Sequence, residues 1–563
     1  MSVVTPTPPG EKGPARNDST THSSQTRSID NNHTFDLEGG HEGQVQPVTS
    51  RVSHISQEEE FRNDPHCVNF TYQDPQDPRT LPEWKKWSIT LIALSIQMWA
   101  NAISSMAAPA IEAISPDLDV SVPAGRVIQA IFLYGFALGA VVLTPLSEDY
   151  GRRPTHIAST ALMGIFQIPC ALAPNFGTMV AFRFIAGFFA AATFNSVGII
   201  SDMWDPDNQS WPVNSFALAA ELGAEVGPII GGFILINAGW RWIFGVAGLG
   251  SAFLLGVFIL FCPETRSGVI LKRRAAKVRK ETGDDRFFAH HEIVLRERTL
   301  MAILQETLFR PVYMLFREPI VLWFAIFDGF NYMIIYLALE SIPLVYQQWG
   351  FSEGELNLPF IGMFLGSCVA FGLYYFQLRY EKKEADKNDG EKPPESRLFW
   401  MIPGGIIFPA SLFWFAWTSQ GPPVPWIVSV LALGAFGLSS HIIFISVSDY
   451  TIASYSIYSA SAVGAQSLLR EILSGSVTLF SHQMYVNLGY QWASTVLAFI
   501  AVVLAIVPPI LYIFGPRIRA ASAFALEIQQ AEKHAKQIAH QAKLEFDRSN
   551  TEATARETQE STV

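Results

Sequence analysis

Residues 182–244 read FRFIAGFFAAATFNSVGIISDMWDPDNQSWPVNSFALAAELGAEVGPIIGGFILINAGWRWIF, and this stretch decides the fold. Its two long apolar segments contain Arg183 and an acidic pair, Glu221 and Glu225. Because charges are costly inside hydrocarbon, an ionisable residue within a span is first interpreted as functional. The glycine- and proline-rich run 223–232 favours close helix contact and a bend. The stretch therefore predicts a moving, charge-handling part of a membrane protein.

The composition of the whole chain supports this interpretation. The 563 residues are 49% hydrophobic and 16% charged, whereas soluble domains are about 25% charged. We expect an all-α polytopic membrane protein. No basic stretch indicates nucleic-acid binding, and the four cysteines are scattered. A Walker A loop, a Cys/His metal cluster and a nucleophile elbow are absent from the sequence, so we expect no cofactor, no metal and no enzymatic activity.

Twelve segments have the roughly 20 apolar residues that a membrane-spanning helix needs. A polar insert at 263–318 separates them into two sets of six, which predicts two six-helix bundles. The predicted spans are 87–109, 125–145, 155–173, 178–201, 213–237, 241–262, 319–347, 356–376, 398–418, 425–447, 453–481 and 490–514.

The spans divide the chain into five predicted parts. These are a disordered N-terminal tail (1–82), the N-terminal bundle (83–262), a linker (263–318), the C-terminal bundle (319–515) and a C-terminal tail (516–563). Lysine and arginine are concentrated after spans 2, 6, 8 and 12, which places both tails and the linker in the cytoplasm. His290 and His291 lie in the linker, where we expect them to be solvated.

The connection between spans 2 and 3 carries a charged motif, TPLSEDYGRRPTH at 144–156. Gly151 permits a tight turn, and Glu148 at the helix end can pair with an arginine or with a helix terminus. The segment resembles the loop 2–3 motif of the major facilitator superfamily through Glu148, Gly151, Arg152 and Arg153. The resemblance implies the major facilitator fold and a latch on the cytoplasmic face. The alternative is an ordinary positively charged turn.

Arg183 and Gly187 in span 4 resemble the Arg-x-x-x-Gly motif of the same superfamily. There the arginine lies inside the N-terminal bundle and is linked to proton coupling. Arg183 lies near the start of its span, so the alternative is an arginine that extends its charge to the membrane surface.

Span 5 contains a glycine every four residues, which makes a flat stripe for close helix contact, and a proline that bends the helix. This run resembles the antiporter motif of the proton-driven exporters of the superfamily, which its symporters and uniporters generally lack. The alternative is a packing stripe without directional meaning. The motif residues are Gly223, Gly227, Pro228, Gly231 and Gly232.

Glu221 and Glu225 are one helical turn apart and so share a face of span 5. Burial and mutual repulsion favour the protonated form of such a pair, as a proton carrier requires. We therefore expect proton coupling to involve Arg183, Glu221 and Glu225. The two acids can instead bind a cationic substrate or pair with Arg183.

Polar and aromatic residues recur along span 7, and their combination is typical of a cavity for bulky, partly polar molecules. In span 11, Arg470 and Glu471 are adjacent and point to different helix faces. We therefore expect each side chain to contact a residue on another helix, and not its neighbour. The candidate substrate cavity comprises Gln97, Asn101, Asp328, Asn331, Tyr332, Tyr336, Glu340, Gln466 and Arg470.

The core at 84–519 resembles the fungal twelve-span drug:proton antiporters. The matching segments are PLSEDYGRRP (145–154), GWRWIF (239–244), PETRSGVILKRRAAKVRKETGD (263–284), PESRL (394–398), FPASLFWFAWTS (408–419) and YSIYSASAVGAQSLLR (455–470). The resemblance implies a monomeric exporter in the plasma membrane, or in a vacuolar or vesicle membrane. Its partners would be a drug, toxin or secondary metabolite, protons and the lipid bilayer, and it would work by alternating access.

The sequence departs from the family pattern at three places. Thr144 replaces a usual glycine, Asp149 adds a charge, and span 1 has no mid-span acid, so coupling depends on Glu221 or Glu225. Other functions remain as alternatives: a proton symporter that takes up a nutrient or organic acid, a polyamine exporter, or a receptor that binds without transporting. The side chains do not identify the substrate.

Overall fold

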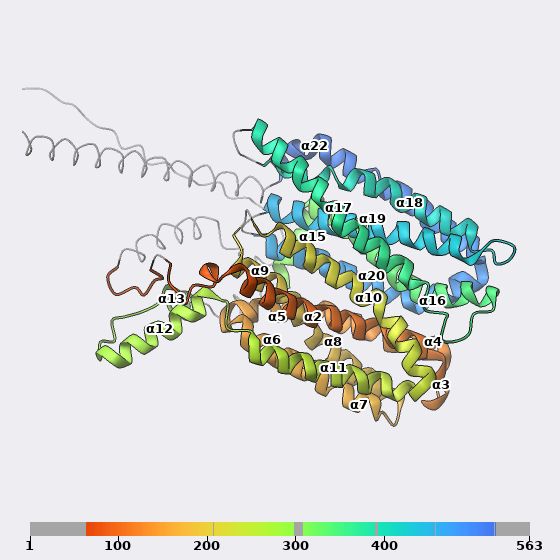
Figure 1. The fold of residues 1–563 in the computed structure, drawn as a ribbon, viewed down its shortest axis with the longest axis horizontal. Helices are drawn as coiled ribbons and strands as arrows, with labels where there is room; N and C mark the ends of the chain where they lie inside the picture. Colours follow the sequence, from red (N-terminus) through yellow and green to blue (C-terminus); the bar gives the residue numbers. More distant parts are fainter. Residues whose placement is uncertain are drawn as a thin grey trace, which may run out of the picture. The chain divides into compact units, whose positions relative to one another are not determined.

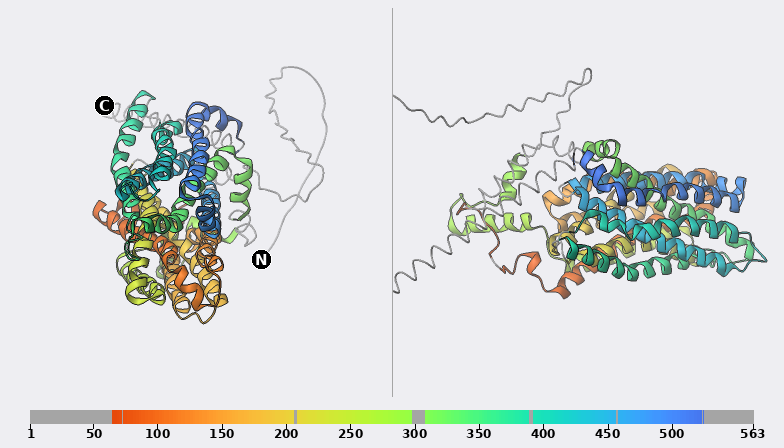
Figure 2. Two further views of the ribbon diagram at one scale, coloured as in Figure 1. Left: turned by 90° about the vertical axis from the view of Figure 1, so that its right-hand side faces the viewer. Right: turned by 90° about the horizontal axis from the view of Figure 1, so that it is seen from above.

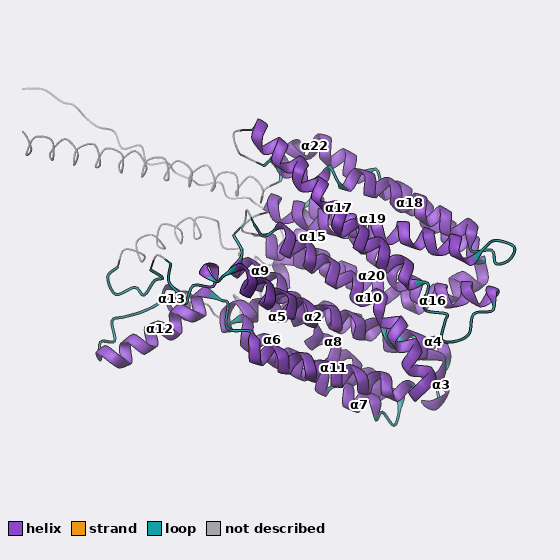
Figure 3. Cartoon of the chain, viewed as in Figure 1, coloured by secondary structure: helices purple, strands orange, loops and turns teal. Residues whose placement is uncertain are grey.

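The computed structural model describes residues 64–71, 73–205, 208–297, 308–388, 392–455, 458–522 and 524. This part of the chain is helical and contains no strand, only an isolated bridge between Cys67 and Phe288 (Figure 3). Ten of its helical segments are long and apolar enough to cross a membrane. Large apolar side chains such as Leu249, Phe253 and Leu260 are exposed on helix α11, as a lipid-facing surface requires.

The N-terminal half forms one bundle, drawn in red to yellow-green in Figure 1. The glycine stripe of α10 packs against α2, and α5 packs against α8. Its helices are α2 (Glu83–Ser105), α3 (Ile111–Asp117), α4 (Val122–Gly125), α5 (Val127–Tyr150), α6 (Arg152–Ile165), α7 (Gln167–Ala171), α8 (Phe176–Ala190), α9 (Ser196–Met203), α10 (Ser210–Ala238) and α11 (Trp240–Phe261).

The C-terminal half forms the second bundle, drawn in green to blue. Here α16 packs against α20, and α17 and α18 pack against α19. Its helices are α15 (Arg310–Arg317), α16 (Pro319–Tyr346), α17 (Phe360–Lys387), α18 (Met401–Thr418), α19 (Trp426–Tyr455), α20 (Ser459–Leu488), α21 (Tyr490–Leu504) and α22 (Val507–Ala521).

A helix coincides with each predicted span, but the span at 178–201 is divided into α8 and α9, and the span at 490–514 into α21 and α22. Two further spans also differ from the expected form. The span at 155–173 is broken into α6 and α7 at Phe166. Helix α19 continues through polar residues up to Tyr455 and α20 begins at Ser459, so both bounds lie later than predicted. These differences do not change the order of the helices.

The linker contains α12 (Ser267–Thr282) and α13 (His290–Glu297), which project beyond one end of the bundles (Figure 2). We call the end at Gly151, where α5 meets α6, the insert end, and the end at Ser104 the opposite end. Asp74 pairs with Arg274 of α12, and the Val68 amide donates to the Phe288 carbonyl at 2.9 Å. The prediction of disorder over 1–82 is thus wrong for the described residues from 64 onward, because these contacts order them. Residues 1–63 lie outside the described residues.

Candidate functional site

The acidic pair of α10 lies at the interface between the two bundles. Glu221 and Glu225 are both fully buried. His441 of α19 places Nδ1 2.7 Å from Oε2 of Glu221, and the Ser440 hydroxyl donates to Oε1 at 2.9 Å. The hydroxyl of Ser367 on α17 donates to Glu225 Oε1 at 3.1 Å. Both acids of the pair are therefore held by side chains of the C-terminal bundle.

His441 is in turn held between two residues of α10. Its Nε2 lies 2.9 Å from Oδ1 of Asn214, which is two turns before Glu221. The Asn214 amide donates to the Phe371 carbonyl of α17 at 3.4 Å. These contacts form a continuous chain of hydrogen bonds across the interface, and all of the side chains in it are buried.

Arg470 is the buried cation of the C-terminal bundle. Its Nη1 lies 3.4 Å from Asp328 Oδ2, and its Nη2 lies 3.3 Å from Glu471 Oε1. The prediction that Arg470 and Glu471 would not meet is wrong, because the long arginine side chain folds back toward its neighbour while also reaching Asp328. The guanidinium also lies 5.1, 4.9 and 5.1 Å from the ring centroids of Phe194, Tyr332 and Phe444.

Three further residues of α16 point toward the N-terminal bundle. The Tyr332 hydroxyl donates to Asn101 at 3.4 Å, and the Tyr336 hydroxyl lies 2.5 Å from the Ser104 hydroxyl. Glu340 Oε2 lies 3.1 Å from Arg126 Nε at the opposite end. Glu340 is therefore part of an ion pair at the end of the bundles rather than of the predicted cavity.

The other predicted cavity residues are buried in separate surroundings. Gln466 donates to Thr451 within the C-terminal bundle at 2.8 Å, so it does not join the interface set. Asn331 donates to the Ser440 carbonyl at 3.4 Å. Among the described residues, the side-chain amide of Gln97 has no hydrogen-bond partner although it is fully buried.

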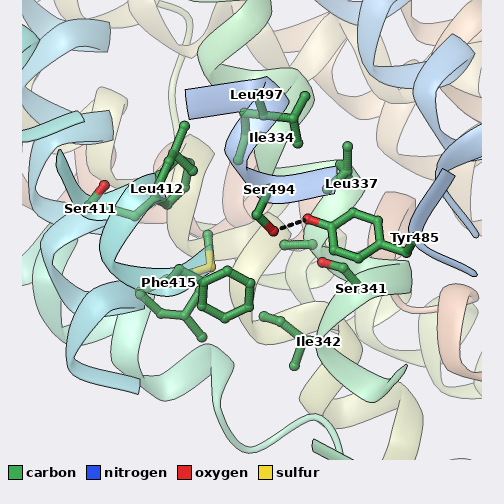
Figure 4. Close-up of a pocket in the computed structure, with 14 residues that line it drawn as sticks. Ile334, Leu337, Ser341, Ile342, Ser411, Leu412, Phe415, Tyr485, Ser494 and Leu497 are labelled. Carbon is green, nitrogen blue, oxygen red and sulfur yellow. Dashed lines mark hydrogen bonds between the residues drawn. The ribbon is translucent and has the colours of Figure 1, made fainter. Parts of the chain in front are cut away.

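A small apolar cavity lies inside the C-terminal bundle, not between the bundles (Figure 4). Its walls come from α16 to α21, and the Tyr485 hydroxyl lies 2.9 Å from the Ser494 hydroxyl at one side. None of the nine residues of the predicted substrate cavity lines it. Of the predicted residues, Asn101, Tyr332 and Tyr336 instead make contacts between the two bundles.

Arg183 is 1% exposed, so the alternative in which it extends to the membrane surface is wrong. Its Nη2 donates to the carbonyls of Ile103 and Ser104 at 2.8 and 3.3 Å, and its guanidinium lies over the Phe132 ring at 4.3 Å. A cation is favourable beside carbonyls at a helix C-terminus, and α2 ends here. Arg183 forms no ion pair with Glu221 or Glu225, so the alternative in which those acids pair with Arg183 is also wrong.

The glycine stripe of α10 packs directly on the backbone of α2. A methyl group added at Gly223, Gly227 or Gly231 would collide with the carbonyls of α2. Gly187 makes a similar close approach to the backbone of α5. Gly232 faces a side chain of the other bundle, that of Asn357. Pro228 lies inside α10, which continues to Ala238.

The loop 2–3 motif organises the insert end of the N-terminal bundle. Gly151 has φ +110°, a conformation that favours glycine, and it joins α5 to α6. Arg152 is buried and pairs with Asp202 of α9 at 3.0 Å. Glu264 accepts hydrogen bonds from the backbone amides of Arg152 and Arg153 at 3.0 and 3.3 Å. A carboxylate at the start of α6 is stabilised by these amides and by the helix dipole.

Sequence reasoning missed the acidic partners in this motif. Asp202 directly follows the predicted span 178–201, and an acid at a span end is a signal that could have identified it. Glu264 lies in the matched segment PETRSG, but its contact with α6 depends on tertiary packing. Glu148, which was expected to pair with an arginine or a helix terminus, makes no ion pair within the described ranges. His441 was not among the site residues predicted from the sequence.

Two helical bundles with buried ionisable groups at their interface define a polytopic membrane transporter. Residues 91–479 match the family model of the Major Facilitator Superfamily, and this chain belongs to that superfamily. It is therefore a transporter and not an enzyme.

Similar proteins come from fungi. The MFS-type transporter acdC of Aspergillus candidus is 35% identical, with 81% of this chain and 89% of that protein covered. The MFS-type efflux pump MFS2 of Trichophyton rubrum is 34% identical, over 87% of this chain and 82% of the relative. The citrinin biosynthesis cluster MFS transporter mrr1 of Monascus ruber is 34% identical, over 80% and 91%. The solved proton:xylose symporter XylE has the same fold, with a TM-score of 0.56, 14% identity and coverage of 77% and 96%.

Proposed function

We propose that this chain exports small organic molecules, namely drugs, toxins or secondary metabolites, in exchange for protons by alternating access. Relatives named as an efflux pump and as a biosynthesis-cluster transporter support export. The observation that carries the proposal is the position of Glu221 and Glu225. Both acids belong to one bundle and are held by side chains of the other, so the bundles cannot separate there without changing the surroundings of both acids.

Contacts close the interface on both sides of the acidic pair. At the opposite end, Tyr336 meets Ser104, and Arg126 pairs with Glu340. Toward the insert end, the Trp211 ring lies 5.4 Å from that of Phe371. Alternating access would break one set of contacts while the other remains. The protonation state of the acids would decide how strongly the two bundles hold together there.

The substrate would enter the interface where the predicted cavity residues now meet. Asp328, Asn331, Tyr332, Tyr336 and Arg470 line it from the C-terminal bundle. Gln97 and Asn101 line it from the N-terminal bundle, and the unpartnered amide of Gln97 is free to bind a polar group. Arg183 would act by holding the end of α2.

Other features of the transporter are part of the same proposal. The loop 2–3 motif (Glu148, Gly151, Arg152 and Arg153) would gate the insert end, and the α10 stripe (Gly223, Gly227, Pro228, Gly231 and Gly232) would set the direction of transport. The transporter would be a monomer in the plasma membrane with both tails in the cytoplasm, which the lysines and arginines of the insert end support. The domain boundaries would fall at 82, 262, 318 and 515.

Two experiments test the function. Deletion and overexpression strains are first scored against antifungal drugs and secreted metabolites, to find a compound whose resistance or secretion depends on this chain. Export of that compound into everted vesicles is then measured against an imposed pH gradient. We expect Glu225→Gln to uncouple export from the gradient, while Glu353→Gln, at an exposed loop position, leaves it intact.

The outcomes separate the alternatives. Full pH-dependent export by Glu225→Gln would remove this residue from the mechanism. Uptake driven by an inward proton gradient would establish a symporter. Binding of the compound without its crossing the membrane would establish a receptor.

A further inference from the structure

His441 is a buried titratable group that joins the bundles at the acidic pair. We propose that His441 and Glu221 together bind one exchangeable proton, and that Asn214 makes the contact between α10 and α19 depend on this proton. The inference deepens the proposed function, on which it rests, by naming a proton-binding dyad that spans both bundles. It is carried by the directions of three consecutive hydrogen bonds.

The first step fixes the orientation of the Asn214 amide. A backbone carbonyl can only accept a hydrogen bond, so Asn214 turns its Nδ2 toward the Phe371 oxygen. Its Oδ1 then faces Nε2 of His441 at 2.9 Å. Because an amide oxygen also only accepts, Nε2 of His441 carries a proton and donates it to Asn214.

The second step concerns the other ring nitrogen. With a proton on Nε2, a neutral imidazole has a bare, accepting Nδ1. An ionised carboxylate is also acceptor-only, and the two atoms lie 2.7 Å apart. Oε1 of Glu221 is already the acceptor for Ser440, so a further proton lies between Nδ1 and Oε2. Whether this proton is assigned to the ring or to the carboxyl group, the dyad holds it.

The third step is the consequence of losing this proton. The ionised carboxylate would then face a bare Nδ1, unless the ring proton moved to Nδ1. That move leaves a bare Nε2 against the oxygen of Asn214. One of the two contacts that His441 makes with α10 is repulsive in either arrangement. Deprotonation therefore weakens the contact between the bundles, and protonation closes it.

The charged groups around the dyad come from three helices. Glu225 of α10 and Asp328 of α16 both interact electrostatically with Glu221. Arg470 of α20 pairs with Glu471 of the same helix and with Asp328, so this cation is already engaged. On α17, Cys368 lies near Glu225 and not in the dyad. The dyad therefore lies near acids of both bundles.

A spectroscopic experiment tests the dyad without any substrate. The full chain, labelled with 15N-histidine and placed in lipid bilayers, is studied by solid-state NMR from pH 5 to pH 9. The signal of His441 is identified by its loss in His441→Gln. We expect Nε2 to be protonated at low pH, and one proton to be lost on raising the pH in a step that Glu221→Gln alters. A ring protonated on Nδ1 alone at every pH, or a titration unchanged in Glu221→Gln, would overturn the proposal.

A second measurement tests the link to bundle contact. Dyes on Tyr150→Cys and Lys383→Cys report the distance between the bundles at the insert end by energy transfer, in a chain with Cys67 and Cys368 changed to serine. We expect a larger separation at high pH than at low pH.

Matched variants show which histidine is responsible. His441→Gln can still form hydrogen bonds but cannot titrate, so it should lose the pH response, whereas His482→Gln should retain it. A response that persists in His441→Gln contradicts the proposal. Neither measurement needs export, so failure of the vesicle assay would refute the proposed function while leaving the proton-binding result to stand or fall separately.

Discussion

Arg126, directly before α5, and Glu340 of α16 form an ion pair between the two bundles, with 3.1 Å between Nε and Oε2. Their side chains are 2% and 11% exposed. The pair lies at the opposite end, beyond the contact between Tyr336 and Ser104. Since the partners belong to different bundles, the pair joins the bundles at this end.

Breaking this pair should open the opposite end. Glu340→Gln replaces a charge-assisted hydrogen bond, and such bonds contribute about 1.5–3 kcal/mol. In a Ser104→Cys background we expect labelling by a water-soluble thiol reagent to become roughly tenfold faster or more, since about 1.4 kcal/mol corresponds to a factor of ten. Glu353→Gln, at an exposed position, is the control and should label at the parent rate. Equal rates in Glu340→Gln and its parent would show that the pair does not hold this end closed.

The buried pair of Arg152 and Asp202 should be important for stability. Asp202→Asn leaves the Arg152 guanidinium buried without its counter-charge, and breaking a buried pair costs about 3–5 kcal/mol. We expect a clear fall in the thermal unfolding midpoint of the purified protein. The exposed pair of Lys277 and Glu281 gives the comparison, because Glu281→Gln should change the midpoint little. If Asp202→Asn and Glu281→Gln had the same unfolding midpoint, the buried pair of Arg152 and Asp202 would contribute no more to stability than the exposed pair.

The helices could be predicted from the sequence because each span needs its own apolar run. Breaks within a span do not follow from its apolar composition: the strongly apolar span 490–514 divides into α21 and α22. Ionisable residues in apolar runs are equally visible, so Glu221, Glu225 and Asp328 could be selected. What each of them touches depends on how helices far apart in sequence pack together.

The errors in the candidate site have the same origin. Glu221 meets His441, which is 220 positions later, and no local pattern encodes that contact. Glu340 was grouped with Asp328 because both lie on one face of span 7. Twelve residues of helix are roughly 18 Å long, however, so the face runs from the interior to the end of the bundle. Arg183 was correctly expected inside its bundle by family resemblance, but its carbonyl partners on α2 depend on where that helix ends.

Because the glycine stripe of α10 contacts α2, we expect the loss of stability on Gly→Ala substitution to depend strongly on the position. A methyl group at Gly227 collides with the Ala102 carbonyl and the Ser105 hydroxyl of α2. We expect Gly227→Ala to destabilise the protein by about 1–3 kcal/mol, the usual cost of overpacking. Gly256→Ala is the matched control, since no atom lies within 4 Å of its added methyl group. Thermal unfolding in detergent measures the stability of both variants. Equal stability of Gly227→Ala and Gly256→Ala would show that the close contact between α10 and α2 is not needed.

His291 should make the docking of the linker sensitive to acid. Its ring packs against Gly268 of α12, and its Nε2 lies 3.3 Å from the Asp149 carbonyl at the insert end. Burial lowers the pKa of His291 below its ordinary value of 6.5, an effect that the Asp149 carbonyl partly opposes. The undocked linker therefore binds a proton more readily than the docked one. Docking is fully stabilised above pH 6.5 and weakens as the pH falls below that value.

Hydrogen exchange of residues 267–297 measures this docking. After correction for intrinsic rates, we expect less protection at pH 5.5 than at pH 7.5. His291→Gln should remove the difference, because glutamine does not titrate. His290→Gln, at the neighbouring histidine, should preserve it. Equal protection at the two pH values in the unmodified chain would mean that the docked ring accepts a proton without cost, and that the environment of His291 does not couple the linker to pH.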